Sequence, residues 1–273
     1  DKNAIAFSSD NQIFAFISKE NKIEFHSLPV EVQEDPKFLG SISIPEKNIK
    51  NLQFSEDNKY LFAIVNENKI AIWDTKKNPT KPSQEIVPDF ITPESSSRIT
   101  TYSVSKDNII LTANKDGLLE TYDSSGKSIL SPKKSGHKKE ITSIAFSSIG
   151  NTFATGSLDI SENKKYNTLK VWELTKSEIK SKETLTETFP IESISFSPNG
   201  EEIAVGQSNS VLKIWNLKDN IGYAFSKNQH TNLVNASHYS KDGSRIYTSS
   251  KDGSLKIWNG KTKENICTIY PFP

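Results

Sequence analysis

The stretch that decides the fold reads GHKKEITSIAFSSIGNTFATGSLD over residues 136–159 and, after a polar segment, TLKVWEL over residues 168–174. Within it, apolar side chains alternate with smaller ones at 141–146, and a turn-forming segment separates this run from a second apolar run at 153–157. Alternation with a period of two over short runs is typical of β-strands. The stretch therefore predicts three consecutive antiparallel strands.

The length of the chain is compatible with one large all-β domain that needs no disulfide or metal. The chain has 273 residues, enough to bury a substantial core without disulfides or metals. It carries 34 Lys and Arg against 33 Asp and Glu, a net charge of +1. The protein therefore lacks the large positive charge that is typical of proteins that bind nucleic acids or membrane surfaces. It has no apolar run of about 18 residues, so no membrane-spanning segment is expected. Cys267 is the only cysteine, which excludes an internal disulfide and favours a reducing, cytoplasmic location.

The same arrangement recurs along the chain. Six segments share a strand that ends in a small-residue turn: AIAFSSDN (4–11), LQFSEDN (52–58), TYSVSKDN (101–108), IAFSSIGN (144–151), ISFSPNG (194–200) and SHYSKDG (237–243). Six further segments close each unit with an apolar strand that carries an aromatic or imidazole ring near its end: KIEFHSL (22–28), KIAIWDT (69–75), LLETYDS (118–124), TLKVWEL (168–174), VLKIWNL (211–217) and SLKIWNG (254–260). All four tryptophans of the protein, Trp73, Trp172, Trp215 and Trp258, occupy the same place in their units.

A fourth strand is predicted between successive units, at 38–44, 84–87, 127–130, 184–189, 223–226 and 265–270. Four short strands per unit, repeated every 40 to 50 residues or so, are typical of β-propellers. Over nearly its whole length the chain resembles the WD40-repeat family. The resemblance implies an all-β fold, a WD40-type β-propeller in a single domain over 1–273, with repeats at about 1–46, 47–96, 97–138, 139–190, 191–231 and 232–273.

The number of blades is open between two arrangements. Six four-stranded repeats are visible, so the ring has either six blades or seven with one blade absent from this sequence. Seven is the usual number in the family, and the closing TIYPFP (268–273) is similar to the TETFP (186–190) that precedes a first strand. We therefore expect the natural chain to continue.

The family resemblance also implies a polar network in the best-preserved repeats. It links a histidine before the first strand, a Ser or Thr of the second strand, the aspartate that follows, and the tryptophan of the third strand. In the fourth repeat these are His137, Thr155 or Ser157, Asp159 and Trp172. In the sixth they are His230, Thr248 or Ser250, Asp252 and Trp258. We interpret these residues as structural, because a complete network satisfies buried polar atoms and fixes loop geometry.

The sequence contains no pattern that predicts catalysis or a cofactor. The four histidines show no metal-ligand spacing, and no phosphate-binding glycine loop, GxSxG or HExxH is present. We therefore predict no enzyme activity, no catalytic residues, no cofactor and no metal. The resemblance favours a protein-interaction scaffold. The alternatives are a regulatory propeller, such as a nucleotide-exchange factor for a small GTPase, and a sensor or scaffold domain of a longer protein.

Basic residues gather in the long loops that are expected to project from one sector of the propeller's top face. These loops are 88–98, 131–140 and 160–167, with a shorter adjoining turn. Their candidates for partner binding are Arg98, Lys115, Lys133, Lys134, Lys138, Lys139, Lys164, Lys165 and Tyr166. Such a cluster on a nearly neutral protein suits another protein with an acidic or phosphorylated segment, although lysines also keep exposed loops soluble.

Overall fold

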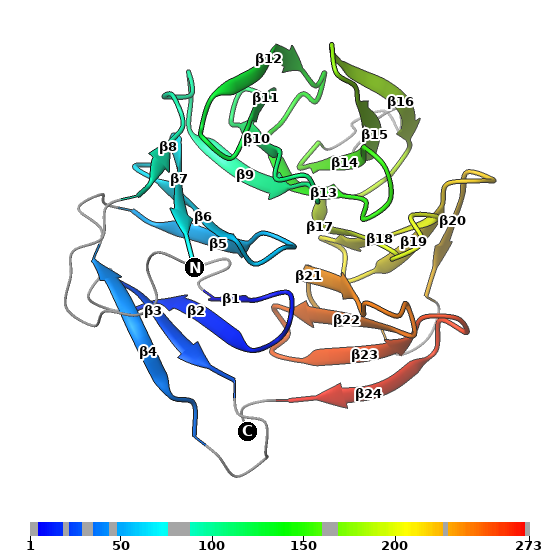
Figure 1. Cartoon of the computed structure of the whole chain (residues 1–273). Coiled ribbons are helices and arrows are strands. Elements are labelled where there is room, and N and C mark those ends of the chain that lie inside the picture. The colour runs from blue at the N-terminus through cyan, green and yellow to red at the C-terminus, as the bar shows by residue number, and fades with distance from the viewer. Residues whose placement is uncertain are drawn as a thin grey trace. The chain divides into compact units, whose positions relative to one another are not determined.

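The computed structural model describes residues 5–18, 22–28, 35–43, 48–75, 88–159, 169–225 and 229–270. Within them the regular structure consists of β-strands, which form six four-stranded antiparallel sheets (Figure 1). The predicted all-β class and the four-stranded repeat are confirmed. The described residues include no helix that is long and apolar enough to cross a membrane.

The chain divides into two compact units, the first made of Asp1–Asn114 with Leu119–Pro132. Its three sheets follow chain order, although the last residues of β12 and Leu118 of β11 belong to the second unit. The strands are β1 (Ile5–Phe7), β2 (Ile13–Ile17), β3 (Lys22–Ser27) and β4 (Phe38–Ser43); β5 (Lys50–Phe54), β6 (Tyr60–Val65), β7 (Lys69–Asp74) and β8 (Phe90–Ile91); and β9 (Ile99–Val104), β10 (Ile110–Asn114), β11 (Leu118–Tyr122) and β12 (Ser128–Lys134).

The second unit is made of Lys115–Leu118 and Lys133–Pro273. Its three sheets contain β13 (Ile141–Phe146), β14 (Thr152–Ser157), β15 (Leu169–Leu174) and β16 (Ile179–Leu185); β17 (Ile191–Phe196), β18 (Glu202–Gln207), β19 (Leu212–Asn216) and β20 (Ile221–Ala224); and β21 (Val234–Tyr239), β22 (Arg245–Ser250), β23 (Leu255–Asn259) and β24 (Asn265–Ile269).

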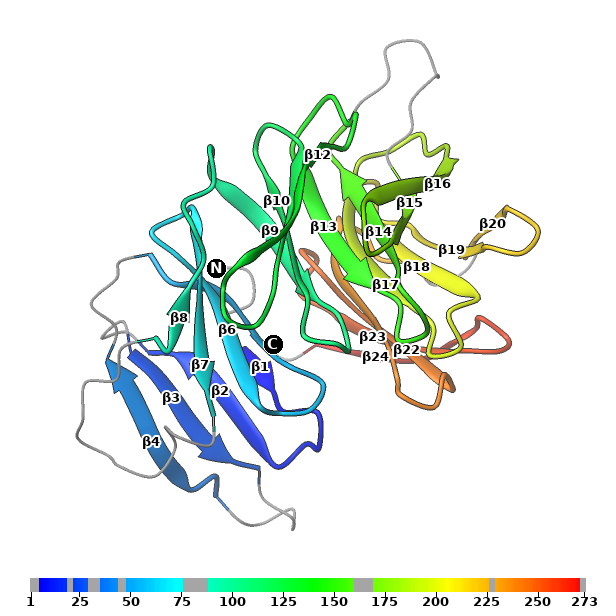
Figure 2. The same cartoon turned by 45° about the horizontal axis from the view of Figure 1, so that its top comes forward.

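Neighbouring sheets of the second unit pack face to face. The first strands β13, β17 and β21 lie side by side, and Figure 2 shows β14 next to β17. One apolar cluster joins Leu169 and Val171 of β15 to Ile194 and Phe196 of β17, so the core lies between sheets. Because both faces of an inner sheet are covered, second strands such as β18 are buried along nearly their whole length.

The fourth strands differ most from the sequence prediction. The strand predicted at 184–189 is β16 (Ile179–Leu185), and 84–87 lies outside the described residues while β8 (Phe90–Ile91) closes that sheet. The segment 131–134, predicted as loop, belongs to β12. These are edge strands that face solvent, and such strands tolerate charges and proline instead of alternating. The charged residues of β16 and Pro132 in β12 do not show the alternation of a half-buried strand, so the sequence analysis placed both segments partly in loops.

The single domain over 1–273 and the number of blades stay predictions. The first and third strands agree with the sequence analysis in all six sheets.

The approach of β14 to β17 requires a residue without a side chain at Gly156. A Cβ there would overlap Ile191 Cγ2 and lie 2.9 Å from both Ile191 Cβ and Ile194 Cδ1. We expect Gly156→Ala to lower the free energy of unfolding by about 1–3 kcal/mol, because the two sheets must separate. Urea unfolding of the whole chain measures it. Gly150→Asn is the control, since an added Cβ has no neighbour within 4 Å and Asn tolerates the positive φ. Equal losses in both variants would contradict close packing at Gly156.

Candidate functional site

A continuous hydrogen-bond chain runs through the sheet β13–β16. The Trp172 indole Nε1 donates to Thr155 Oγ1 at 3.0 Å, and Thr155 Oγ1 lies 2.8 Å from His137 Nε2. His137 Nδ1 lies 3.4 Å from Asp159 Oδ2. The structure thus brings together the four residue types that the sequence analysis placed in one network, with Thr155 and not Ser157 in the central position.

Hydrogen-bond chemistry fixes the direction of this chain. An indole N–H only donates, so Thr155 accepts from Trp172 and can donate its own hydrogen to His137 Nε2. The remaining ring hydrogen on Nδ1 then points at the Asp159 carboxylate. This arrangement suits a neutral imidazole, and burial lowers the pKa of His137 further than the Asp159 hydrogen bond raises it.

The sheet β21–β24 repeats the arrangement. Trp258 Nε1 donates to Thr248 Oγ1 at 2.9 Å, Thr248 Oγ1 lies 2.8 Å from His230 Nε2, and His230 Nδ1 lies 3.0 Å from Asp252 Oδ2. Burial likewise lowers the pKa of His230. Ser254 adds a hydroxyl 3.0 Å from the same Nδ1. Two sheets therefore contain the same Trp–Thr–His–Asp hydrogen-bond chain. Of the two predicted alternatives in the second of them, Thr248 and not Ser250 holds the central position.

The aspartate connects the core to the loop before the first strand. Asp159 Oδ1 accepts from the backbone N–H groups of Lys138 and Lys139 at 3.0 and 2.6 Å. Burial raises the pKa of Asp159, but the hydrogen bonds from His137 and from the Lys138 amide outweigh burial and hold the pKa below its usual value. The loop 135–140 is thus held by a carboxylate while its lysine side chains are exposed.

In the sheet β17–β20 a different residue replaces the histidine, and the sequence analysis missed it. Buried Glu187 accepts hydrogen bonds from Trp215 Nε1, from Gln207 Nε2 at 2.7 Å and from Lys213 Nζ at 3.1 Å. It precedes Ile191 by four residues, the spacing that separates His137 from the first strand of its own sheet. The four-residue spacing could have identified Glu187 from the sequence, although the residue is a glutamate and not a histidine.

The remaining sheets lack parts of the network. Trp73 is fully buried, and its Nε1 finds no acceptor among the described residues. The register of β6 and β7 places Ala63 where Thr155 lies in β14, which explains the missing acceptor. Thr112 keeps the hydroxyl but has no partner in the described part of the chain, because Tyr122 replaces the tryptophan.

Five of the predicted basic residues lie in the second unit and are exposed: Lys115, Lys133, Lys134, Lys138 and Lys139. We call them, together with Lys170, the basic ridge. Hydrogen bonds join its segments: Ser135 donates from its amide and its hydroxyl to Gly117 O at 2.9 and 2.8 Å, and Lys134 Nζ donates to Asp116 O at 3.2 Å. The β10–β11 turn therefore lies against the segment that carries the other lysines.

Lys170 was not predicted as part of this surface. Its Nζ extends from β15 to donate to Ser135 O at 2.7 Å, and it lies 3.0 Å from where a Cβ on Gly136 would be. Burial lowers the pKa of Lys170, against the opposing charge of Asp159. Its position is visible only in three dimensions, because β15 is far from Ser135 in sequence.

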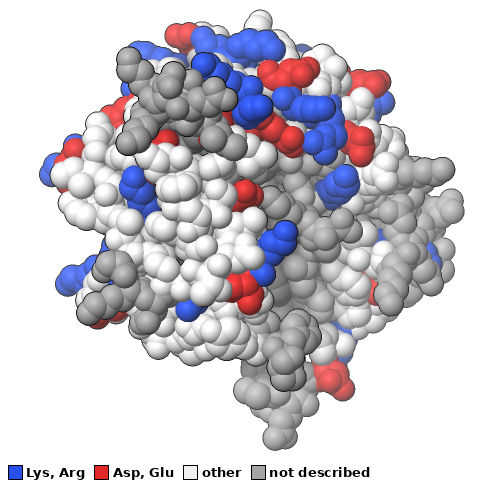
Figure 3. Space-filling model, turned by 180° about the vertical axis from the view of Figure 1, so that it is seen from behind, with Lys and Arg blue, Asp and Glu red and all other residues white. Residues whose placement is uncertain are grey.

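The other predicted basic residues are not placed with the ridge. Arg98 is exposed but belongs to the first unit, while Lys164, Lys165 and Tyr166 lie outside the described residues. Lys133 and Lys134, predicted in a loop, lie on the edge strand β12. Figure 3 shows Lys and Arg side chains gathered near the top of the face drawn there, with acidic side chains among them.

Comparison with known proteins agrees with this geometry. The family described as WD domain, G-beta repeat matches residues 130–173, 180–216 and 224–259, each match reaching the tryptophan of a third strand. These three segments are WD40 repeats. Among curated proteins no match was found. The WD40 matches cover both complete networks and the Trp215 sheet, and proteins of this fold generally act as protein-interaction scaffolds.

The buried imidazoles of His137 and His230 predict a pH-dependent stability. The pKa values of His137 and His230 lie below the ordinary 6.5, so the unfolded chain binds protons more readily as the pH falls through 6.5. We expect the free energy of unfolding, measured with urea, to fall from about pH 8 to about pH 5. The lowered pKa values of Asp159 and Asp252 act only below the ordinary 3.8, outside this window.

The double variant His137→Gln/His230→Gln should show a smaller decrease over the same window. His26→Gln serves as the control, because His26 lies outside both networks. An unchanged pH dependence in the double variant would show that other groups cause it.

The Trp73 indole, which has no acceptor in the part of the chain that the structure describes, predicts a stabilising substitution. Ala63→Ser is expected to raise the free energy of unfolding by about 1 kcal/mol, because the new hydroxyl accepts from Trp73 Nε1. Ala154→Ser is the control: Ala154 is equally buried, but the Trp172 indole of that sheet already has Thr155. The control should lose about 1–3 kcal/mol through a buried, unsatisfied hydroxyl. Equal losses in urea unfolding would contradict the assignment.

Proposed function

We propose that this WD40 chain is a non-enzymatic interaction module that binds an acidic or phosphorylated segment of another protein on the basic ridge. The observation that carries the proposal is the anchored loop 135–140. Asp159 holds the backbone of Lys138 and Lys139, and Ser135 joins the loop to the turn that carries Lys115. Several exposed ammonium groups therefore lie on a backbone that is already ordered.

Rigid placement matters for binding by lysine. A lysine ammonium is a point charge on a flexible stem, so an isolated surface lysine contributes little to affinity. Lysines that are grouped on a fixed backbone create a local positive potential, which complements carboxylates or phosphates and speeds their association. The net charge of only +1 makes this local excess a property of one surface and not of the whole protein.

The histidines support a binding role over a catalytic one. His137 and His230 have both ring nitrogens engaged with threonine and aspartate, so neither ring is free to move a proton to a substrate. The described residues also contain no group of three or more His, Cys, Asp or Glu side chains suited to a metal. We therefore assign these networks to structure.

The proposal is tested with defined peptides. Fluorescence anisotropy would measure binding of the full chain to a fluorescein-labelled octaglutamate and to a Gly-Ser peptide with and without phosphoserine, from about 25 to 200 mM salt. Binding should weaken with salt, and Lys115→Glu/Lys138→Glu/Lys139→Glu should weaken it by about tenfold or more, because attraction becomes repulsion.

The matched control changes three exposed lysines of the same unit that lie outside the ridge: Lys176→Glu/Lys251→Glu/Lys261→Glu. It should keep the parental affinity. Equal weakening in both triple variants would reduce the interaction to nonspecific attraction and overturn the proposal. Absence of binding to every acidic peptide at low salt would overturn it as well.

A further inference from the structure

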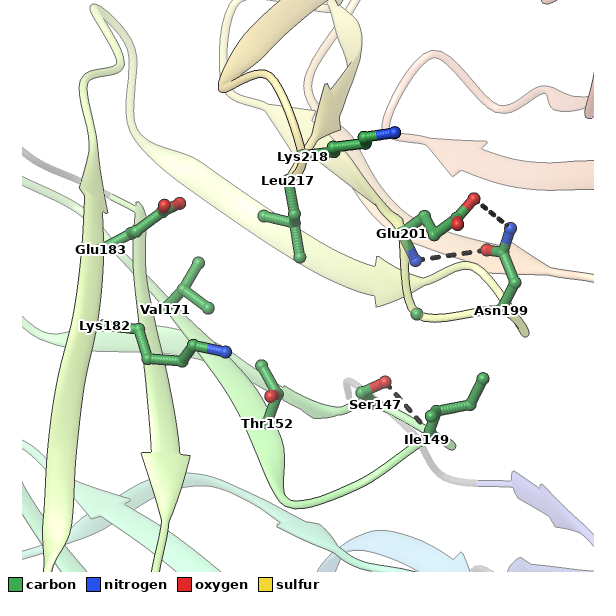
Figure 4. A pocket seen from close by; sticks show the side chains of 11 residues that line it. Ser147, Ile149, Thr152, Val171, Lys182, Glu183, Asn199, Glu201, Leu217 and Lys218 are labelled. Atoms are coloured by element: carbon green, nitrogen blue, oxygen red, sulfur yellow. Dashed lines mark hydrogen bonds between the residues drawn. The ribbon is translucent and has the colours of Figure 1, made fainter.

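A cleft lies inside the second unit, between the sheets β13–β16 and β17–β20. Its volume is about 300 Å³, at the lower end of the range of ligand pockets. It opens where the turns β13–β14 and β17–β18 come together, and Figure 4 shows the side chains around it. The lining residues are Ser147, Ile149, Thr152, Val171, Lys182, Glu183, Asn199, Gly200, Glu201, Leu217 and Lys218.

Hydrogen bonds between the two sheets hold the cleft at both sides. On one side the two turns touch: Ser148 Oγ donates to Pro198 O at 2.9 Å. There a Cβ on Gly200 would lie 2.8 Å from Ser147 Oγ, so glycine permits the contact. On the other side Asn220 Nδ2 donates to Glu183 Oε1 at 3.1 Å. The cleft is therefore formed before anything binds.

Two apolar side chains lie in the walls of the cleft, and its rim carries two lysines and two glutamates. Val171 is buried in the core between the sheets, and Leu217 packs against the same core from the other wall. Figure 4 shows Lys182 reaching across the cleft toward Thr152. Within the described part of the chain, neither Lys182 nor Lys218 has an ion pair or hydrogen-bond partner for its Nζ.

The two carboxylates at the rim already have partners. Glu183 accepts from Asn220, and Glu201 accepts from Asn199 Nδ2 at 2.8 Å. Amides neutralise no charge, but they hold both carboxylates in place at the wall. The rim is therefore neutral as a whole, and within the described residues the charged groups without a partner are the two ammonium groups, of which Lys182 reaches into the cleft.

We propose that this cleft binds an extended segment of a partner protein in which an aliphatic side chain is adjacent to an aspartate or glutamate. The aliphatic side chain lies against Val171 and Leu217, and the carboxylate lies beside Lys182. The volume admits one such side chain with its neighbouring backbone, so the site reads a short motif. Its residues do not overlap the basic ridge, and its failure would leave the ridge proposal intact.

The test uses three blocked tripeptides: acetyl-Glu-Leu-Glu-amide, acetyl-Glu-Ala-Glu-amide and acetyl-Lys-Leu-Lys-amide. Each is titrated into the ¹⁵N-labelled full chain, and amide shifts are followed by NMR. The first peptide should shift the amides of Val171, Lys182 and Leu217 in a saturable manner, and more strongly than the other two. Shifts confined to the basic ridge, or equal responses to all three peptides, would overturn the proposal.

Two lysines of β16 provide the matched variants. Lys182→Glu should weaken binding of the acidic leucine peptide by about fivefold or more, because an attractive charge becomes repulsive. Lys180→Glu makes the same change on the same strand but outside the cleft, and should keep the parental affinity. Equal weakening by the two variants would show only general charge attraction and would overturn the proposal. Both lysines are exposed, so neither change is expected to unfold the sheet.

Discussion

The hydrogen bond from a buried tryptophan indole to a threonine hydroxyl is the interaction on which the two complete repeats depend. A large ring fills the space between sheets, but its N–H cannot be buried without an acceptor. Thr155 and Thr248 supply that acceptor and pass the requirement to a histidine and then to an aspartate near the surface. One chain of hydrogen bonds thus pairs the buried indole of the core and also fixes the position of a surface loop. Glu187 meets the same requirement with a carboxylate, whose charge is balanced by Lys213.

The parts of the fold that pack on both faces were predictable from sequence, and the edges were not. First and third strands must present apolar residues to their neighbours, so alternation and the recurrent tryptophans locate them. The fourth strands have one side in solvent, and there burial places little constraint on residue type. In β16 only the terminal residues Ile179 and Leu185 are fully buried, and five mostly exposed residues separate them. Periodicity cannot find such a strand, although pairing with β15 in three dimensions does.

The residues of the candidate site likewise fall into those that the sequence predicted and those that it did not. The residues of the His–Thr–Asp–Trp networks were predicted because they recur at the same distance in sequence from the first and third strands of their repeats. The choice of Thr155 over Ser157 needed coordinates, because both lie on one face of β14 and only their distance along the strand from Trp172 separates them. Lys170 and Glu187 escaped notice for different reasons. Lys170 joins the basic ridge across a long sequence separation, and Glu187 keeps the position of a histidine with another chemistry.

The sequence repeat and the sheet are offset by one strand. The match at 180–216 begins in β16, the last strand of one sheet, and ends with β19, the third strand of the next. Duplication of a unit with these limits adds one edge strand and three inner strands together, and loss of the unit removes the same four. The edge strand that remains then meets a third strand of equivalent register, so every sheet can still be completed. Such a chain can change its length by whole repeats without leaving any sheet short of a strand, which gives the architecture a simple route to new copy numbers.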